Sequence, residues 1–415
     1  MLWSVCAVNP HSAAHFSRYA FRAVPPLSAF DPGILDFAGS AVWMEAHSQA
    51  PPTLRRAEYL APLLPFEWVS PAWAVQFLGS LLLATMLFGS IAGEREQGTL
   101  AMVVSSGVSP RTIGRTKVAA GIIASSAFAL MCLAASLLVT AIALRSSIPW
   151  ARVFSLGVAY LAGFAVLAGL FLWLSVRSRS AGVAFAWCGG LWVVFAVVVP
   201  FAGAELGARL YPTPIASAFD AEAKLRAGDA FWRDEDNKKR VTDEFALSLA
   251  KNEGHDSVDG LGFNREGLEL QASEVFANQV FDELYGALYA THRRQGDVLA
   301  ALSFLSPVLA LRRISAALSG TDTESQIDFA TQAEQHRRVI IEQMNIDMIR
   351  HAGDEGYGYT ADVELWESIA DFEPALQGLG KTFARLWVEW TALAVWLLTI
   401  FVLLSRALTR LEVYP

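Results

Sequence analysis

Few stretches of this chain carry residue types at a spacing that could do chemistry. Residues Ala375–Thr382 satisfy a loose phosphate-loop pattern, in which backbone N–H groups and a lysine bind phosphate. Such a loop must follow a strand and open a helix, whereas Asp371–Pro374 is typical of a turn. We therefore expect Lys381 to lie at the entry of a membrane helix, and we expect no nucleotide site here.

His11 and His15 are four residues apart, which places both imidazoles on one face of a helix. Zinc sites use three or four ligands, and the nearby sequence offers no third one. The pattern favours an ordinary surface or interface helix around His11–Phe21, with this pair as a weak metal candidate. No catalytic triad, zinc motif or paired-carboxylate set emerges by spacing, so we expect a protein that is not an enzyme and binds no cofactor itself.

Ionisable residues beside apolar runs are better functional candidates, because charges near a membrane are costly. Glu205 closes one apolar run and Glu389 opens another. Arg385 could pair with Glu389, four residues away on a helix. The alternative is a pair of interfacial side chains that reach towards water.

A shorter apolar stretch, Val298–Leu311, contains Pro307 and cannot span a bilayer. It indicates an interfacial or re-entrant segment over 298–320 that rests as an amphipathic helix at the outer surface. The alternative is a buried core helix of an outer domain.

The composition is that of a membrane protein. Hydrophobic residues make up 54% of the 415 residues and charged residues only 17%, against about 25% charged in soluble domains. Five apolar runs are long enough to cross a bilayer as helices. These runs are Trp73–Ala92, Val118–Leu144, Val153–Val176, Ala181–Ala204 and Leu386–Leu404. The predicted fold class is an all-α polytopic membrane protein with five membrane helices.

The charge is unevenly distributed. Residues 207–380 carry a net charge of about −14. Because the whole chain carries −8, the remaining residues carry about +6. The acidic charge of 207–380 argues against nucleic acid as a partner. Apolar spacings of three and four predict helices over Phe219–Lys251, Leu268–Gln295 and Thr323–His351. We expect an acidic, mostly helical domain over 207–382. The three cysteines, Cys6, Cys132 and Cys188, do not form a disulfide framework.

Basic residues in the short loops predict which ends of the membrane helices face the cytoplasm. They form three groups that fall on one side if every helix spans once: Arg95, Arg111, Arg115 and Lys117; Arg177 and Arg179; Arg406 and Arg410. We expect this side to be cytoplasmic. The predicted domains are an extracytoplasmic segment 1–70, helices one to four in 71–206, the extracytoplasmic domain 207–382, and the last helix with a cytoplasmic tail in 383–415.

The polar insert between the first two apolar runs has its own pattern. Glu94 and Glu96 precede Leu100 and its apolar neighbours, and Gly107 and Pro110 follow. We interpret residues 93–107 as one short amphipathic helix at the membrane surface, with its acids near the start, where the helix dipole favours them.

The run Glu94–Lys117, EREQGTLAMVVSSGVSPRTIGRTK, resembles the first cytoplasmic loop of type-2 ABC transporter permeases. Three further runs resemble a subfamily with a large extracytoplasmic insert of unknown function before the last helix: Asn9–His15, Tyr211–Pro214, and Leu305–Pro307 continuing to Asp322. The resemblance implies the membrane subunit of an ABC exporter in a bacterial inner membrane. It also implies that the insert is a coupling helix, which docks on a separate ATPase through Glu94, Arg95, Glu96, Gly98, Thr99 and Leu100.

The same resemblance implies partners: the ATPase, which holds ATP and magnesium, a second permease copy or paralogue, and membrane lipid. It also implies six membrane helices, so we expect a first helix upstream of Met1; the alternative is a tail that reaches the outside unaided. The alternative function is a membrane-anchored binding or sensor protein. A lipid, a lipopeptide and a peptide all stay open as the substrate.

Overall fold

The computed structural model describes residues 8–16, 18–60 and 69–412. Helices make up 73% of it and strands are few. Within the described part, five helices are long and apolar enough to cross a membrane. The predicted fold class, an all-α multi-pass membrane protein, is confirmed.

The five spans coincide with the predicted apolar runs to within about eight residues at each end. The first two spans start earlier than predicted, because a serine cap and a proline at the first helical position precede the apolar run. Ser70, Ser109 and Ser180 each accept a hydrogen bond from a backbone N–H of the first turn. The spans are Pro71–Glu96 (α3 Pro71–Ala74, η2 Val75–Gly79, α4 Ser80–Leu87, α5 Gly89–Glu96), α7 Pro110–Ile142, α8 Trp150–Arg177, Ala181–Leu210 (α9 Ala181–Val193, η3 Val194–Val198, α10 Val199–Leu210) and α19 Trp387–Thr409.

Helix α8 is the centre of the bundle, and most of its side chains from Leu156 to Val176 are buried. Two of its glycines allow neighbouring helices to pack closely against α8. A Cβ on Gly163 would lie 3.0 Å from Leu311, and one on Gly169 would lie 2.4 Å from Ile400. Gly157 has no described atom within 4 Å of that position, so the close contacts are confined to the inner part of α8.

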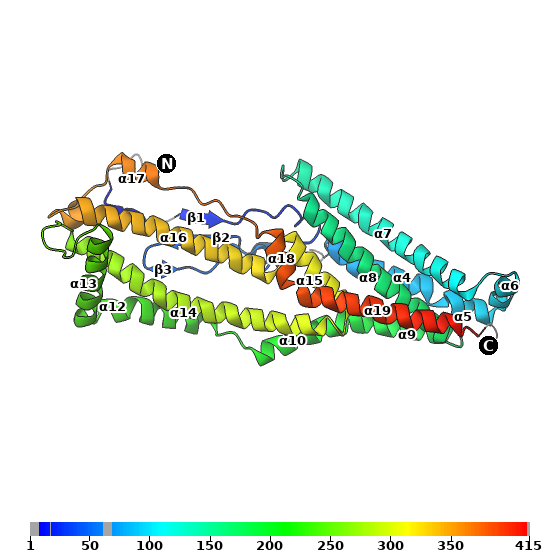
Figure 1. Cartoon of the computed structure of the whole chain (residues 1–415). Coiled ribbons are helices and arrows are strands. Elements are labelled where there is room, and N and C mark those ends of the chain that lie inside the picture. Colours follow the sequence, from blue (N-terminus) through cyan, green and yellow to red (C-terminus); the bar gives the residue numbers. More distant parts are fainter. Residues whose placement is uncertain (1–7, 17, 61–68, 413–415) are drawn as a thin grey trace.

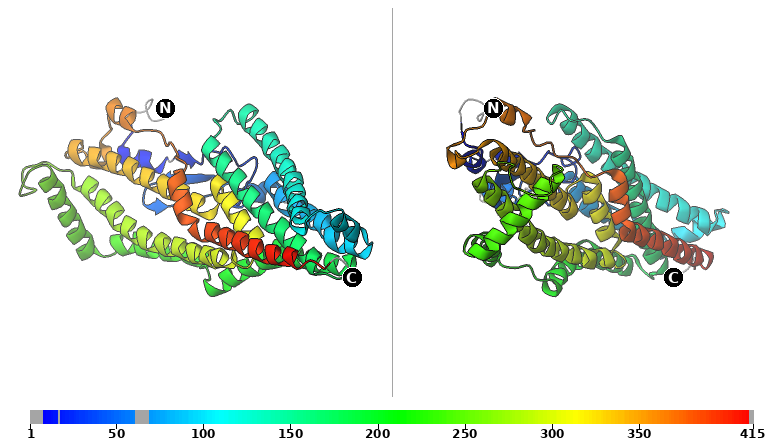
Figure 2. Two further views of the ribbon diagram at one scale, coloured as in Figure 1. Left: turned by 45° about the vertical axis from the view of Figure 1, so that its right-hand side comes forward. Right: turned by 60° about the vertical axis from the view of Figure 1, so that its left-hand side comes forward.

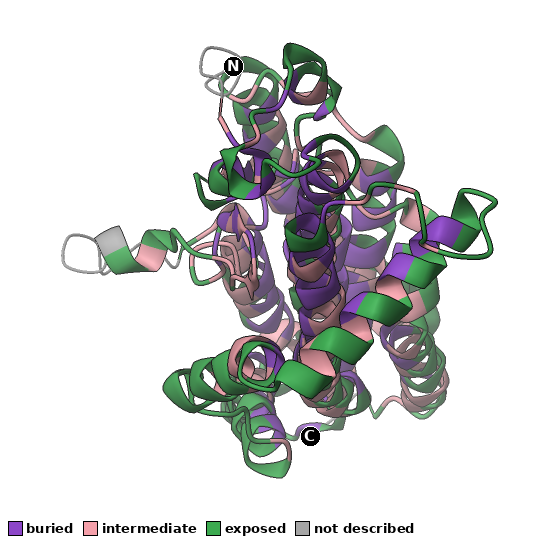
Figure 3. Ribbon diagram, turned by 90° about the vertical axis from the view of Figure 1, so that its left-hand side faces the viewer, coloured by how far each residue is buried: buried purple, intermediate pink, exposed green. Residues whose placement is uncertain are grey.

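The acidic domain is helical. Its elements are α11 Ala216–Ala223, η4 Lys224–Asp229, α12 Ala230–Trp232, α13 Glu235–Asn252, α14 Arg265–Leu302, α15 Pro307–Ser319, α16 Thr323–His351, η5 Gly356–Gly358, α17 Val363–Ser368 and α18 Leu379–Arg385. The structure matches the predicted helix Thr323–His351 residue for residue. Helices α14 and α16 pack side by side and extend away from the membrane helices (Figures 1 and 2). Buried residues run through the middle of the molecule (Figure 3).

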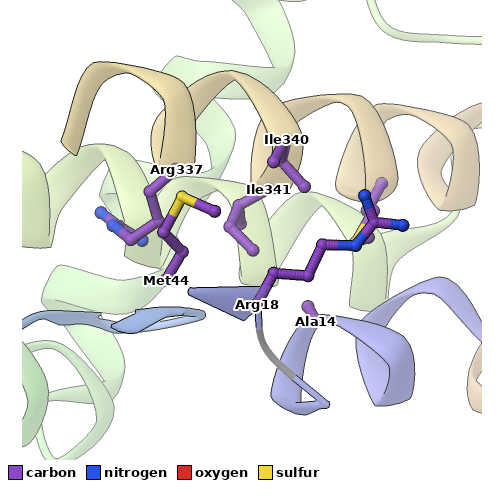
Figure 4. Close-up of a pocket in the computed structure, with 7 residues that line it drawn as sticks. Ala14, Arg18, Met44, Arg337, Ile340 and Ile341 are labelled. Atoms are coloured by element: carbon purple, nitrogen blue, oxygen red, sulfur yellow. The ribbon is translucent and has the colours of Figure 1, made fainter. Parts of the chain in front are cut away.

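The N-terminal segment contains strands that the sequence analysis missed. Helix α1 covers only Pro10–His15, and β1 Arg18–Phe21 pairs antiparallel with β2 Ala41–Glu45, which pairs with β3 Ser48–Gln49. The predicted helix around His11–Phe21 was therefore too long. Side chains from α1 and β2, such as Ala14 and Met44, pack beneath Ile341 of α16 (Figure 4), which makes this segment part of the acidic domain's core. Short helices α2 Arg56–Leu60 and α6 Thr99–Ser105 complete the described elements.

Residues 298–319 form a hairpin inserted into the bundle: the end of α14, a turn at 303–306, and α15. Ser306 donates a hydrogen bond to the carbonyl oxygen of Phe195 at 2.9 Å, and Leu311 packs on Gly163. Phe195 and Gly163 lie near the middle of their spans. The re-entrant option of the prediction over 298–320 fits this placement, whereas a helix that rests at the outer surface does not. The alternative of a core helix of the outer domain does not fit either, because α15 packs among the membrane helices.

Candidate functional site

Helix α6 lies at the basic end of the bundle, which carries exposed Arg111, Arg115, Arg177, Arg179, Arg406 and Arg410. Figure 1 shows α5, α6 and the described C-terminus together at this end. Here the structure corrects the predicted helix over 93–107. Residues 93–96 are the last turn of the first span, and the short helix is Thr99–Ser105. Gly98 makes the break, because its φ of 74° suits glycine and ends a helix.

The acids of this segment therefore lie at a helix end, and each has a partner inside the chain. Glu94 pairs with Lys117 at 2.7 Å between Oε1 and Nζ. Glu96 accepts a hydrogen bond from the backbone N–H of Ala181 at 3.0 Å, where α9 begins. Both carboxylates thus connect the first span to its neighbours.

Arg95 is buried, with 6% of its surface exposed. Its guanidinium donates to the carbonyl oxygens of Ser178, Val176 and Glu412 at 2.7, 3.1 and 2.9 Å. These bonds provide hydrogen-bond donors for carbonyl oxygens at the end of α8 and attach the C-terminal tail to it. The expectation that Arg95 contacts a docking partner is wrong, because the side chain faces inward.

The outer face of α6 remains available. Leu100 is fully buried beside Ile113 and Leu408 and anchors the helix. Gly98 and Thr99 are exposed, and so are Met102, at 71%, and Val103, at 38%. We call these four residues the α6 surface. Met102 and Val103 give it an apolar character.

A second polar arrangement surrounds the inserted hairpin. Pro307 starts α15, is buried, and follows the cap Ser306. Glu389 is fully buried and pairs with Arg313 of α15 at 2.6 Å. Arg385 instead binds Asp322 at the start of α16. The expected pair Arg385–Glu389 is therefore wrong, because two long-range partners replace the local one.

Glu205 contributes less than expected. It does not end the fourth span, which continues to Leu210. Its carboxylate pairs with Arg209 at 2.6 Å, and both side chains are more than half exposed. Exposed pairs one helical turn apart stabilise a helix by about 0.3–0.5 kcal/mol, so this pair is of minor importance.

A chain of four polar side chains links the first span, α8, the hairpin and the N-terminal segment. Gln76 donates to the Tyr160 hydroxyl at 2.9 Å, and that hydroxyl lies 3.1 Å from Ser315 Oγ. Ser315 donates to Asp31 Oδ2 at 2.5 Å. Burial raises the pKa of the Asp31 carboxyl, and the hydrogen bond from Ser315 only partly offsets this. This chain was not predicted from the sequence, although a glutamine and a tyrosine inside apolar runs were a usable signal.

A cavity of about 380 Å³ opens between the first span, the fourth span and α15. The π-helical turns η2 and η3 of the first and fourth spans contribute to its wall, and such turns are frequent at functional sites. The lining residues are Trp73, Gln76, Phe77, Ala196, Val197, Pro200, Phe201, Val308 and Arg312. The lining thus combines one charged residue, Arg312, and one amide, Gln76, with apolar and aromatic side chains, an arrangement that suits an amphiphile with a negative group.

Residues 221–375 match the family model described as a domain of unknown function, DUF3526. The matched range begins within α11 and ends beyond α17, so it contains the hairpin and most of the acidic domain. No curated protein and no solved structure matches the chain.

Proposed function

We propose that this chain is the membrane subunit of an ABC exporter and that the α6 surface docks on a separate ATPase subunit in the cytoplasm. The observation that carries the proposal is the α6 surface itself, which is an exposed apolar helix face between the first two spans. The resemblance of Glu94–Lys117 to a coupling helix supports it. DUF3526 domains, moreover, often occur in ABC-transporter permease-like proteins.

The arginines at the basic end support the orientation that we propose. Arginine and lysine are enriched in cytoplasmic loops, so this end faces the cytoplasm of a bacterial inner membrane and the acidic domain faces outward. ATP and magnesium belong to the ATPase, and a second permease copy or paralogue completes the path.

Coupling would pass through the ends of α6. The left-handed Gly98 joins it to the first span, and the turn at Ser106 and Gly107 joins it to α7. When two ATPases close on ATP, a pull on α6 would tilt both helices. The first span also forms one wall of the 380 Å³ cavity. A shift of that wall would change access to the cavity, where Arg312 would bind the negative group of an amphiphilic substrate.

The test is ATPase stimulation in proteoliposomes that contain the chain and the ATPase encoded beside it. Met102→Glu places a charge on the α6 surface and touches no buried contact. We expect it to abolish the stimulation while insertion and folding stay unchanged. Val363→Glu is the matched control, because Val363 is an exposed apolar residue on the short helix α17 of the acidic domain.

Full stimulation with Met102→Glu would overturn the proposed docking surface. A membrane-anchored binding or sensor protein would give no stimulation with any variant, and its gene would have no ATPase neighbour.

A further inference from the structure

Three histidines from two separate elements meet on the N-terminal segment. His11 and His15 lie on α1, and His47 lies in the turn between β2 and β3. The ring centroids are 4.7 Å apart for His11 and His15, 5.3 Å for His11 and His47, and 5.5 Å for His15 and His47. One ligand nitrogen of each ring lies within 4.8 Å of the other two. The third ligand, which the sequence around α1 lacks, is thus supplied by His47.

The spacing of the His11 and His15 nitrogens suits a metal ion. The Nε2 atoms of His11 and His15 are 3.3 Å apart. Zinc–nitrogen bonds of about 2.0–2.1 Å in a tetrahedral shell place neighbouring nitrogens about 3.3–3.4 Å apart.

A buried carboxylate orients the third ring. His47 Nδ1 lies 2.9 Å from Oε1 of Glu274, which also accepts the backbone N–H of His47. With Nδ1 engaged, Nε2 is the nitrogen left for a metal. Metal-binding histidines usually donate their other ring N–H to a carboxylate, a backbone carbonyl or a water molecule. His47 also has a φ of 62°, a left-handed conformation that few non-glycine residues adopt.

That carboxylate is itself fixed. Glu274 is 2% exposed and pairs with Arg337 of α16 at 3.0 Å. Arg337 is 1% exposed and also binds Glu334 at 2.8 Å and Asn278 at 2.9 Å. Residues from α14 and α16 therefore hold Glu274 before any ligand arrives, so the orientation of His47 is built into the domain's core.

We propose that His11, His15 and His47 bind a divalent transition-metal ion of the zinc class, with Glu274 as the carboxylate behind His47. Imidazole ligands suit zinc, copper and nickel, whereas magnesium and calcium prefer oxygen. His15 is exposed, so the fourth position faces solvent. The ion would clamp α1 to the β2–β3 turn and, through Glu274, to α14.

The test uses the full chain in detergent, purified without a histidine tag, stripped with a chelator and then equilibrated with Zn²⁺, Co²⁺ or Mg²⁺. We expect one zinc per chain by elemental analysis, the intense visible absorption of tetrahedral Co²⁺, and no competition from Mg²⁺. His47→Ala should weaken zinc binding about a hundredfold or more, and Glu274→Gln about 10- to 100-fold.

His255→Ala is the matched control, since His255 is exposed and lies far along the chain in the loop after α13; it should bind zinc as the wild type does. Weak octahedral Co²⁺ absorption in the wild-type chain would overturn the proposal without relying on any variant. Unchanged zinc affinity in a folded His47→Ala variant would also overturn it.

Discussion

Replacing Arg313 with methionine should destabilise the protein by about 3–5 kcal/mol, the cost of leaving a buried charge without its partner. Glu389 is 0% exposed, and its Oε1 lies 2.6 Å from Arg313 Nε. Its Oε2 has no hydrogen-bond partner among the described residues. Arg313→Met thus leaves both carboxylate oxygens unpaired inside the bundle. At 1.4 kcal/mol per factor of ten, the unfolding equilibrium constant should rise more than about a hundredfold.

The double variant Arg313→Met with Glu389→Leu should recover most of this loss, because apolar replacements of a buried pair are often neutral or stabilising. Unfolding in mixed micelles, followed by tryptophan fluorescence, measures all the variants on one scale. Arg209→Met is the control: it breaks a pair whose side chains are 77% and 52% exposed, and it should cost less than about 1 kcal/mol.

A cost for Arg313→Met no larger than that for Arg209→Met would refute the reasoning. So would a double variant as unstable as the single one. Either result would mean that Glu389 reaches water and that α15 is not held among the membrane helices.

Two further predictions concern the acidic domain and the N-terminal segment. Gly267→Ala should destabilise by about 1–3 kcal/mol, because its Cβ would lie 2.9 Å from the backbone nitrogen of Ile349; Gly286→Ala on the same helix, with open space there, should stabilise by about 0.5–1 kcal/mol. Equal unfolding midpoints for the two variants would contradict this close packing. Burial raises the pKa of the Asp31 carboxyl above its usual 3.8, so the folded state binds this proton more tightly than the unfolded state does. The free energy of unfolding therefore falls as the pH rises from about 3.8 through the raised pKa. Asp31→Asn should therefore gain stability relative to wild type between pH 4 and pH 8, and a difference independent of pH in unfolding titrations would contradict the raised pKa.

The membrane spans were predictable because each depends on a local, continuous apolar run. The helix Thr323–His351 was predictable for a similar reason, since its apolar spacing, its cap and its glycine-rich end are all local. Helix ends were harder to predict. Residues 93–96 look polar enough to leave the membrane helix, yet the chain stays helical until Gly98.

Partners distant in sequence could not be predicted. Ser315 and Asp31 are 284 residues apart, and Arg313 and Glu389 are 76 apart. A local pattern favours the nearest opposite charge, which is why Arg385 was assigned to Glu389. His47 was missed as a neighbour of His11 because the sheet that brings it close has short strands with a weak pattern.

The most direct measurement places a photo-crosslinking amino acid at Met102 in whole cells. We expect a crosslink to an ABC ATPase, no crosslink to it from the same amino acid at Val363, and protection of Met102→Cys from a membrane-impermeant thiol reagent. Labelling of that cysteine in intact cells, or crosslinks to proteins of the exterior alone, would contradict the docking of α6 on a cytoplasmic ATPase.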